Sequence, residues 1–296
     1  MSLPPGVFAA AVTPFSEGGR QVDLDWIAAH LAYLEENGAD GVLTLGTTGE
    51  GPSLSLEERR QVIDAVLGHR RRLWVLVGTG CASLTDTIEI SRYACRAGAD
   101  AVMIVPPFYY KGVDDRGLMA YYDAVMAALP AEARVILYNI PDVTAVEISD
   151  DLLDYLIARQ PKKVAGIKDT SGRLERLEGY IQRYPQLSVY VGSDDLIASG
   201  LKAGALGAIS AAANIYPQLV RDVRQRLLAG EDAESSQAAI DRVLEVLRRY
   251  PTFAAIKHWL RIAAGLPQTY VRPPLRDLTP QEAAALEQEV GQAVLL

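Results

Sequence analysis

The segment RVILYNIPDVTAVEISDDLLDYLIARQPKKVAGIKD, residues 134–169, contains the pattern that decides the fold. It begins and ends with a short apolar run, RVILYNIP (134–141) and KVAGIKD (163–169), and the residues between them predict a helix. Each run is continuous rather than alternating, as in parallel strands that are covered on both faces. The segment therefore predicts one strand–helix–strand unit of a parallel sheet.

The same unit recurs along the chain. Apolar runs of this kind span residues 6–15, 40–50, 73–80, 100–108, 134–141, 163–169, 187–194 and 204–210. Their starts lie about 20 to 35 residues apart, the length of a strand, a helix and two loops. Eight such units predict an α/β fold of the (β/α)8 TIM barrel type. The alternative is an open doubly wound sheet, which normally carries a glycine-rich fingerprint after strand 1, where this chain has VTPFSEGG.

Helix boundaries are marked between the runs. Ser55 and Glu58 have the spacing of a capping box at a helix start. Gly38, Gly98 and Gly204 each stand just past a predicted helix and just before a strand, where the chain needs a positive φ. These signals support alternating strands and helices.

The strand pattern stops after about residue 215. Four stretches then predict helices: 216–230, 232–250, 250–265 and 279–295. The first would close the barrel, and the other three would pack outside it. We therefore expect a barrel domain at residues 1–228 and a C-terminal helical domain at residues 229–296.

Composition narrows the function. The 296 residues are 49% hydrophobic and 22% charged, as in an ordinary globular protein. A net charge of −8 argues against nucleic acid or an anionic membrane as a partner. No apolar stretch approaches the ~18 residues of a membrane span, and the start lacks a signal-peptide pattern. Cys81 and Cys95 are too few for a disulfide framework, so these features predict a cytoplasmic protein.

In a barrel of this type the C-terminal ends of the strands form the active site. His30, His69 and His258 all fall in helical stretches and few carboxylates end strands, so we expect no metal site, with a carboxylate-only Mg²⁺ site as the weaker alternative. The residues at the strand ends are Thr13, Thr47, Thr48, Thr79, Tyr109, Tyr138, Asn139, Lys168, Ser193 and Ser210.

Lys168 is the most informative of these residues, because it ends an apolar run. The other five lysines stand in polar or helical stretches, and most of them are expected to be solvated. A rim lysine beside Val164 and Ile167 is partly desolvated, which favours the neutral amine that attacks carbonyls. Lys168 therefore predicts a Schiff base with a keto substrate.

Other residues bear on this prediction. Gly166, two positions earlier on the same face, would leave space for a substrate. Tyr138 ends the preceding strand, where its phenol would serve as the proton shuttle that imine formation needs. The alternatives are a core tyrosine, and a lysine that reaches solvent or pairs with Asp169.

The turn GTTGEG, residues 46–51, supplies hydroxyls and exposed backbone N–H groups at the end of strand 2. That combination suits a carboxylate. No Lys-Ser or Lys-Thr follows, so the turn is not a nucleotide-binding P-loop.

Five motifs together resemble a known family. They are GTTGEGPSLSLEER (46–59), YNIP (138–141), GIKDTSG (166–172), GAISAAAN (207–214) and RPPL (272–275). In this order, from about residue 6 to 280, they are similar to the dihydrodipicolinate synthase/N-acetylneuraminate lyase family of class I aldolases. The resemblance implies a (β/α)8 barrel with a C-terminal helical domain, a homotetramer built as a dimer of dimers, and no metal or organic cofactor.

The resemblance also implies catalytic roles. Lys168 would hold pyruvate, or a 2-keto acid that contains it, as a Schiff base, and Tyr138 would move the protons. Thr47 would relay protons to a tyrosine of a neighbouring subunit, and alignment of PPFYYKG identifies that tyrosine as Tyr109.

Substrate-binding roles follow in the same way. Thr48 and the backbone around it at Gly49 would hold the pyruvate carboxylate, and the carbonyl of Ile209 would lie beside the keto acid. Gly192 and Ser210 complete the expected substrate-binding set.

Departures from the family pattern concern the second substrate. The synthase branch has an arginine five residues past the strand-5 tyrosine, which pairs with the carboxylate of aspartate semialdehyde, and this chain has Val143 there. The synthase Tyr-Tyr pair is Phe108-Tyr109 here. Ala82 and Asp86 replace the asparagine and glutamate of the lysine feedback site, which argues against inhibition by lysine.

These residues predict a pyruvate-dependent class I aldolase, a lyase, that cleaves or condenses a 2-keto acid of the 2-keto-3-deoxy sugar acid or hydroxy-oxo acid type with an aldehyde. The alternatives are 4-hydroxy-tetrahydrodipicolinate synthase, a keto-deoxy-acid dehydratase that uses the same imine, and a catalytically silent ligand-binding barrel. A metal-dependent aldolase would need ligands that the strand ends lack.

Overall fold

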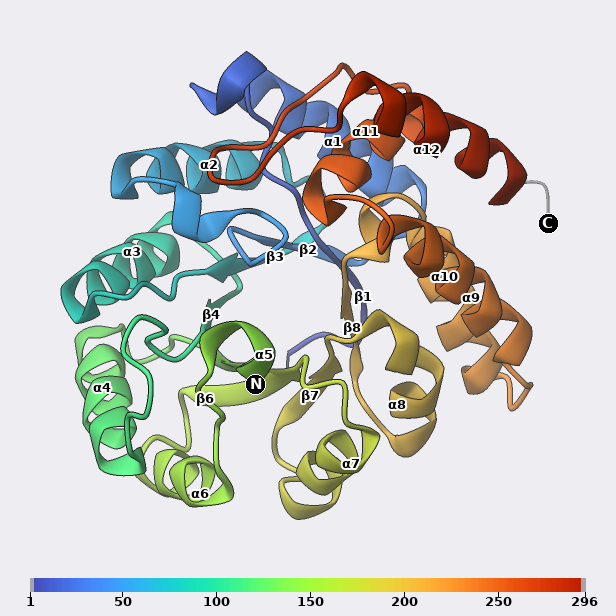
Figure 1. The fold of residues 1–296 in the computed structure, drawn as a ribbon. Coiled ribbons are helices and arrows are strands. Elements are labelled where there is room, and N and C mark those ends of the chain that lie inside the picture. The colour runs from blue at the N-terminus through green and yellow to red at the C-terminus, as the bar shows by residue number, and fades with distance from the viewer. Residues whose placement is uncertain (1–2, 294–296) are drawn as a thin grey trace.

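A closed sheet of eight parallel strands stands at the centre of the computed structural model, which describes residues 3–293 (Figure 1). Each strand pairs with its neighbours in chain order, and β1 pairs with β8 to close the barrel. The predicted (β/α)8 barrel is confirmed, and the open-sheet alternative is wrong. The strands are β1 Gly6–Ala10, β2 Gly41–Thr44, β3 Trp74–Gly78, β4 Ala101–Ile104, β5 Val135–Asn139, β6 Val164–Asp169, β7 Ser188–Val191 and β8 Gly207–Ser210.

Helices surround the barrel. The outer ring is α1 Leu24–Glu36, α2 Leu56–His69, α3 Leu84–Ala97, α4 Asp115–Ala128, α6 Asp150–Arg159, α7 Leu174–Arg183, α8 Ile197–Ala203 and α9 Pro217–Leu228. Short helices lie in the connections: α5 Pro141–Thr144, and the 3₁₀ helices η1 Glu17–Gly19, η2 Gly51–Ser53, η3 Asp194–Leu196 and η4 Ala212–Asn214. The C-terminal helices are α10 Glu234–Leu247, α11 Thr252–Ala264 and α12 Pro280–Ala293.

The predicted helix boundaries have the expected local chemistry. The Ser55 hydroxyl accepts from the Glu58 N–H, and the Glu58 carboxylate accepts from the Ser55 N–H, which is a capping box. Gly38, Gly98 and Gly204 have φ values of 92°, 98° and 112°, a region that glycine enters without strain.

Side chains alternate between the two sides of the barrel wall. Leu137 and Ile167 belong to the outer apolar layer between strands and helices. Tyr138 belongs to a second cluster, with Phe8 and Ile209, that fills the barrel interior. Lys168 pairs directly with Tyr138 across β5 and β6, so this alternation brings both side chains to the inner face.

Gly166 has a packing role. The register of β5 and β6 shifts between Val135 and Ile136, and Gly166 pairs with Ile136. A Cβ on Gly166 would lie 2.3 Å from the carbonyl oxygen of Ser188 on β7. The glycine therefore permits close approach of two strands, and the expectation that it leaves space for a substrate is wrong.

The C-terminal helices lie outside the barrel, as predicted. Figure 1 shows α10 beside α9, and α12 beside α11. The barrel's last helix, α9, ends at Leu228. The division into domains at residues 1–228 and 229–296 stays a prediction, and its outermost residues, 1–2 and 294–296, lie outside the described residues. Within residues 3–293, no helix combines the length and the apolar character needed to cross a membrane.

Candidate active site

Lys168 and Tyr138 form the chemical centre of the candidate site. The Nζ of Lys168 donates to the Oη of Tyr138 over 3.4 Å and lies 4.4 Å from the centre of the tyrosine ring. Each residue is only 4% exposed. A buried amine beside a phenol has the parts needed to attack a carbonyl and to move the protons of that reaction.

The alternative roles for Lys168 do not fit its surroundings. Burial rules out a side chain that reaches solvent. The carboxylate of Asp169 has other partners, because one oxygen accepts from the Asn139 amide at 2.7 Å and the other from the Ser171 hydroxyl at 2.7 Å. Lys168 is thus not held by the neighbouring acid.

Gly192 lies directly against the lysine. A Cβ at this position would come within 2.7 Å of the Lys168 Cε and 2.1 Å of the Thr170 Oγ1. Only glycine leaves room for both side chains. The predicted substrate-binding residue Gly192 therefore shapes the wall beside the Lys168 side chain.

The turn at residues 46–51 packs tightly over the end of β2. The Thr13 hydroxyl donates to the Gly49 carbonyl at 2.6 Å, and a Cβ on Gly49 would lie 2.8 Å from the Ala11 carbonyl. None of the backbone N–H groups of Thr47, Thr48 and Gly49 donates to a backbone carbonyl of the described chain. Three neighbouring N–H donors are a suitable cradle for a carboxylate.

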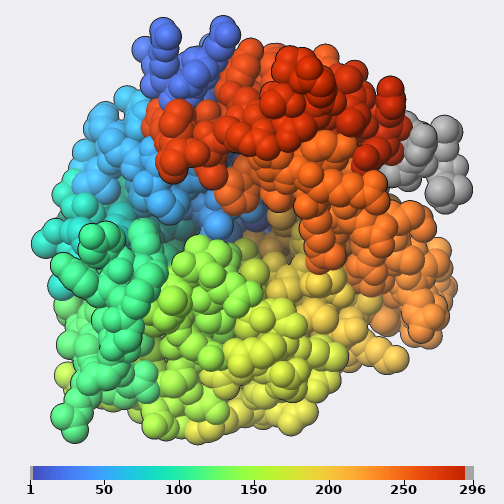
Figure 2. Space-filling view, in the orientation of Figure 1, coloured from blue at the N-terminus to red at the C-terminus, as the bar shows by residue number. Residues whose placement is uncertain are grey.

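A cavity of about 90 Å³ lies between this turn and the ends of β3, β4 and β5. Thr47, Tyr138 and Thr144 supply the hydroxyls that line it. Its other lining side chains are apolar, and Phe108 and Val143 are among them. In Figure 2 this face of the molecule is hollowed near its middle, between blue, green and orange segments.

The remaining predicted residues are distributed around this centre. Thr48 is buried, and Ile209 is fully buried in the barrel interior. The hydroxyl of Ser210, also fully buried, accepts from the Ala213 N–H at 3.0 Å. None of these three lines the cavity. Because Tyr138 lines the cavity and contacts Lys168, the cavity and the lysine are adjoining parts of one region.

Tyr109 does not join the site of its own chain. It lies on the loop after β4, is 73% exposed and packs edge-on against the equally exposed Tyr110. Lys111, two residues on, donates to the carbonyls of Phe108 at 2.5 Å and Thr144 at 2.9 Å, which ties this loop to α5.

Two polar side chains that the sequence did not single out lie near the lysine. Asp194 is buried, one carboxylate oxygen accepts from the Ala212 N–H at 2.8 Å, and burial raises the pKa of this carboxyl, while hydrogen bonds and the charge of Lys168 oppose the rise. Its other oxygen and the Thr170 Oγ1 are buried with no hydrogen-bond partner among the described residues. The available sequence signal was position at a strand end: Thr170 follows Lys168 in GIKDTSG (166–172), and Asp194 follows the next strand in GSDD (192–195).

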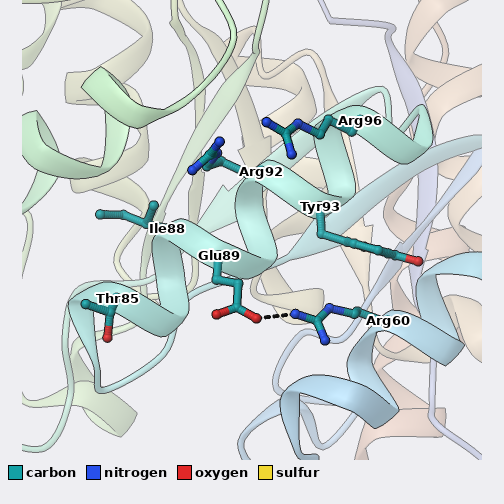
Figure 3. A pocket seen from close by; sticks show the side chains of 7 residues that line it. All are labelled: Arg60, Thr85, Ile88, Glu89, Arg92, Tyr93 and Arg96. Atoms are coloured by element: carbon teal, nitrogen blue, oxygen red, sulfur yellow. Dashed lines mark hydrogen bonds and ion pairs between the residues drawn. The ribbon is translucent and has the colours of Figure 1, made fainter.

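A larger cavity, about 440 Å³, lies elsewhere, on the outer side of α2 and α3 (Figure 3). Arg92, Arg96 and Tyr93 line it, and Arg60 there pairs with Glu89. It contains none of the predicted site residues and lies on the helical layer, so it is not the candidate site. Within residues 3–293, no three His, Cys, Asp or Glu side chains lie close enough to hold a metal ion together.

Comparisons with known proteins identify a family and similar structures. The model of the dihydrodipicolinate synthetase family matches residues 3–293. An uncharacterized DapA-like lyase of Chloroflexus aurantiacus is 43% identical over 286 residues, which cover 97% of this chain and 96% of that protein. A 2-dehydro-3-deoxy-D-gluconate/2-dehydro-3-deoxy-phosphogluconate aldolase of Thermoproteus tenax is 31% identical over 289 residues, 97% of this chain and 91% of that protein. The solved structure of YagE, a prophage protein of the dihydrodipicolinic acid synthase family from E. coli K12 in complex with pyruvate, has a TM-score of 0.92 at 29% identity and 100% coverage of both chains.

Proposed function

The chain belongs to the dihydrodipicolinate synthetase family and is a lyase of the class I aldolase type, and from this premise we propose that Lys168 forms a Schiff base with pyruvate or with a 2-keto acid that contains it. The observation that carries the proposal is the buried Lys168 amine 3.4 Å from the Tyr138 hydroxyl. The reaction is cleavage of a 2-keto-3-deoxy sugar acid or hydroxy-oxo acid to pyruvate and an aldehyde, or the reverse condensation of pyruvate with the aldehyde.

The proposed cycle uses groups of this chain alone. The amine of Lys168 forms a C–N bond to the keto carbon, and the keto oxygen leaves as water with a proton from Tyr138. Loss of a proton from C3 converts the imine into an enamine. The enamine carbon then forms a bond to the aldehyde carbon, the aldehyde oxygen takes a proton, and water releases the product from the lysine. Because the lysine itself forms the imine, this cycle needs no metal or organic cofactor.

The substrate carboxylate has a proposed place in this cycle. The N–H groups of Thr47, Thr48 and Gly49 are suited to hold it, because hydrogen bonds to a charged acceptor are about twice as strong as neutral ones. Ile209 and Ser210 on β8, with Gly192, are proposed to form the opposite wall.

The second substrate is proposed to be hydroxylated and to lack a carboxylate. Val143 lines the cavity and supplies no cation, so a carboxylate of the second substrate would have no charge-assisted partner there. The unpaired oxygens of Thr170 and Asp194 are available to hydroxyl groups. Supporting this choice, the Thermoproteus tenax relative is by its name an aldolase of a 2-dehydro-3-deoxy sugar acid.

4-Hydroxy-tetrahydrodipicolinate synthase is the second candidate, favoured by the family match itself. It would need a cation for the carboxylate of aspartate semialdehyde. Lys111 is a cation near the cavity, but its ammonium already donates to the carbonyls of Phe108 and Thr144, two residues that line it. A dehydratase would begin with the same imine and differ only in eliminating water.

The experiment that separates these candidates measures pyruvate. The purified chain is incubated with 2-dehydro-3-deoxy-D-gluconate, and pyruvate release is followed; in parallel, pyruvate consumption is followed with aspartate semialdehyde. We expect release that disappears in Lys168→Ala. Efficient consumption with aspartate semialdehyde and no release from the sugar acid would assign the synthase reaction. Loss of water without pyruvate release would assign the dehydratase.

Tyr109 is proposed to act across a subunit boundary in a homotetramer. Its 73% exposure leaves the hydroxyl free to enter the site of a neighbouring copy, where Thr47 would receive it. Mixing Tyr109→Phe chains with Lys168→Ala chains tests this, because a hybrid contains one site with both groups intact. We expect activity well above that of either variant alone; no gain in a mixed oligomer would contradict the role.

The two cysteines fit the proposed cytoplasmic location. Both Cys81 and Cys95 are free thiols, and neither is exposed. This is the pattern of a protein that is not built on disulfides.

A further inference from the structure

A buried ion pair joins the C-terminal helices to the turn at residues 46–51. The Nζ of Lys257, on α11, lies 2.5 Å from one carboxylate oxygen of Glu50, and both side chains are fully buried. Most lysines outside the strands were expected to be solvated, and Lys257 is an exception. Because 207 residues separate the two partners, no local pattern shows the pair.

Both members of the pair form further hydrogen bonds. Lys257 also donates to the Tyr270 carbonyl at 2.6 Å and lies 4.7 Å from the ring centre of Phe15. The second oxygen of Glu50 accepts from the Arg272 N–H at 3.0 Å. Burial lowers the pKa of Lys257 to about 8, and the charge of Glu50 opposes this change.

A net gain in stability does not explain why two charged side chains are buried here. Burying two charges carries a desolvation cost that their mutual attraction roughly offsets, so an apolar pair of similar volume is often as stable. What an ion pair adds is directionality: it fixes where the carboxylate of Glu50 and its backbone can lie.

The backbone of Glu50 directly follows the proposed carboxylate cradle, the N–H groups of Thr47, Thr48 and Gly49. Its N–H donates to the Thr47 carbonyl at 3.0 Å, which closes the turn. Glu50 has a φ of 52°, a left-handed conformation that a non-glycine residue adopts only when its surroundings hold it. The lysine and the Arg272 N–H supply that hold from the C-terminal segment.

The same segment clamps the region from a second side. Figure 1 shows the chain between α11 and α12 crossing from α11 to α2. There the Arg272 guanidinium forms two hydrogen bonds to Glu58, at 2.7 and 2.8 Å, and donates to the Ser53 carbonyl at 3.0 Å. The C-terminal segment thus contacts both the turn and the helix that follows it.

We propose that Lys257 and Glu50 are positioning residues that hold the 46–51 turn in the shape that binds the carboxylate of the keto acid. The inference rests on the proposed Schiff-base function. It assigns the C-terminal helices a part in substrate binding: without the ion pair, the N–H groups of Thr47 to Gly49 no longer converge on one carboxylate.

The test compares two keto compounds that differ in one charge. Pyruvate carries the carboxylate and methyl pyruvate does not, so only pyruvate senses the cradle. Half-saturating concentrations for borohydride-trapped adduct are measured in the wild type, Lys257→Met, Glu50→Gln and the double variant, with the exposed Lys202→Met as the matched control. Near-ultraviolet circular dichroism establishes that each sample is folded.

For the pair variants we expect the half-saturating pyruvate concentration to rise about tenfold or more, because a misplaced binding group weakens only the contacts it makes. Their half-saturating concentration for methyl pyruvate should not change. In Lys202→Met, both concentrations should equal those of the wild type. If Lys257→Met does not fold, Glu50→Gln and the double variant, which bury no unpaired carboxylate, give the same comparison. If folded variants keep the wild-type preference for pyruvate over methyl pyruvate, the inference is overturned but the proposed Schiff-base function is not. A wild type that traps neither compound would overturn the proposed function and the inference with it.

Discussion

The Nζ of Lys168 lies 3.4 Å from the Oη of Tyr138, on directly paired residues of neighbouring strands. Both side chains point into the barrel, and both are almost fully buried. This contact puts an amine and a phenol together away from solvent, which is the arrangement that the proposed imine chemistry needs.

Removal of the phenol hydroxyl tests its role as the proton shuttle. Tyr138→Phe should lower kcat by about 10²-fold, because proton transfer by a placed side chain contributes about that much. The matched control is Tyr190→Phe, a buried tyrosine paired with Lys168 on the other side, whose hydroxyl donates to the Pro4 carbonyl. Steady-state rates should be near wild type in the control; a near wild-type kcat in Tyr138→Phe would remove the role.

A methyl group at residue 192 tests the space beside the amine. Gly192→Ala would place its Cβ within 2.7 Å of the Lys168 Cε, so the lysine must shift. We expect at least a tenfold loss of kcat/KM, since sub-ångström displacement of a reacting group is costly. Gly179→Ala on α7, where a Cβ has open space, is the control. Equal activity in the two variants would show that Lys168 tolerates the change.

The barrel could be predicted from the sequence because its signals are local. Eight continuous apolar runs, the Ser55–Glu58 capping box and the glycines at helix ends each depend on neighbouring residues alone, and all of them match the structure. Short elements without such periodicity, such as α5 at Pro141–Thr144, were not predicted.

The site was predictable only in part, for a physical reason. Lys168 and Tyr138 could be paired because strand alternation fixes which way each points. Glu50 and Lys257 could not, since only the folded chain brings a turn and a helix 207 residues apart together. The packing role of Gly166 also depends on a neighbouring strand, β7, that its own segment does not show.

Introducing a cation at residue 143 tests whether the cavity wall selects against a carboxylate on the second substrate. Val143 is 59% exposed and lines the cavity, so an arginine there can reach the site without burial of an unpaired charge. Val143→Arg should raise kcat/KM with aspartate semialdehyde by about tenfold or more, through a charge-assisted bond. Val143→Met, of similar reach and uncharged, is the control. An equal gain with methionine would mean that charge is not the selecting property.

The pH dependence of stability tests a buried histidine. Burial lowers the pKa of His30 to about 4, from 6.5, and its ring packs against Trp26. The unfolded chain therefore binds a proton at higher pH than the folded chain. The stability associated with neutral His30 is complete above pH 6.5 and is lost as the pH falls towards 4.

Between pH 7 and 5 the free energy of unfolding should fall by about 2 kcal/mol because of His30. Urea titrations at both pH values should show a smaller fall for His30→Phe than for the wild type. The exposed His69→Gln should behave as the wild type does. An unchanged pH dependence in His30→Phe would contradict the assignment.

The central claim is that Lys168 forms a Schiff base with pyruvate, and borohydride reduction followed by mass spectrometry tests it most directly. The wild type, incubated with pyruvate and reduced, should gain one covalent adduct per chain, mapped to the peptide that contains Lys168. Lys168→Ala, folded by circular dichroism, should gain none. A folded wild type without an adduct, or an adduct on another lysine, would contradict the account.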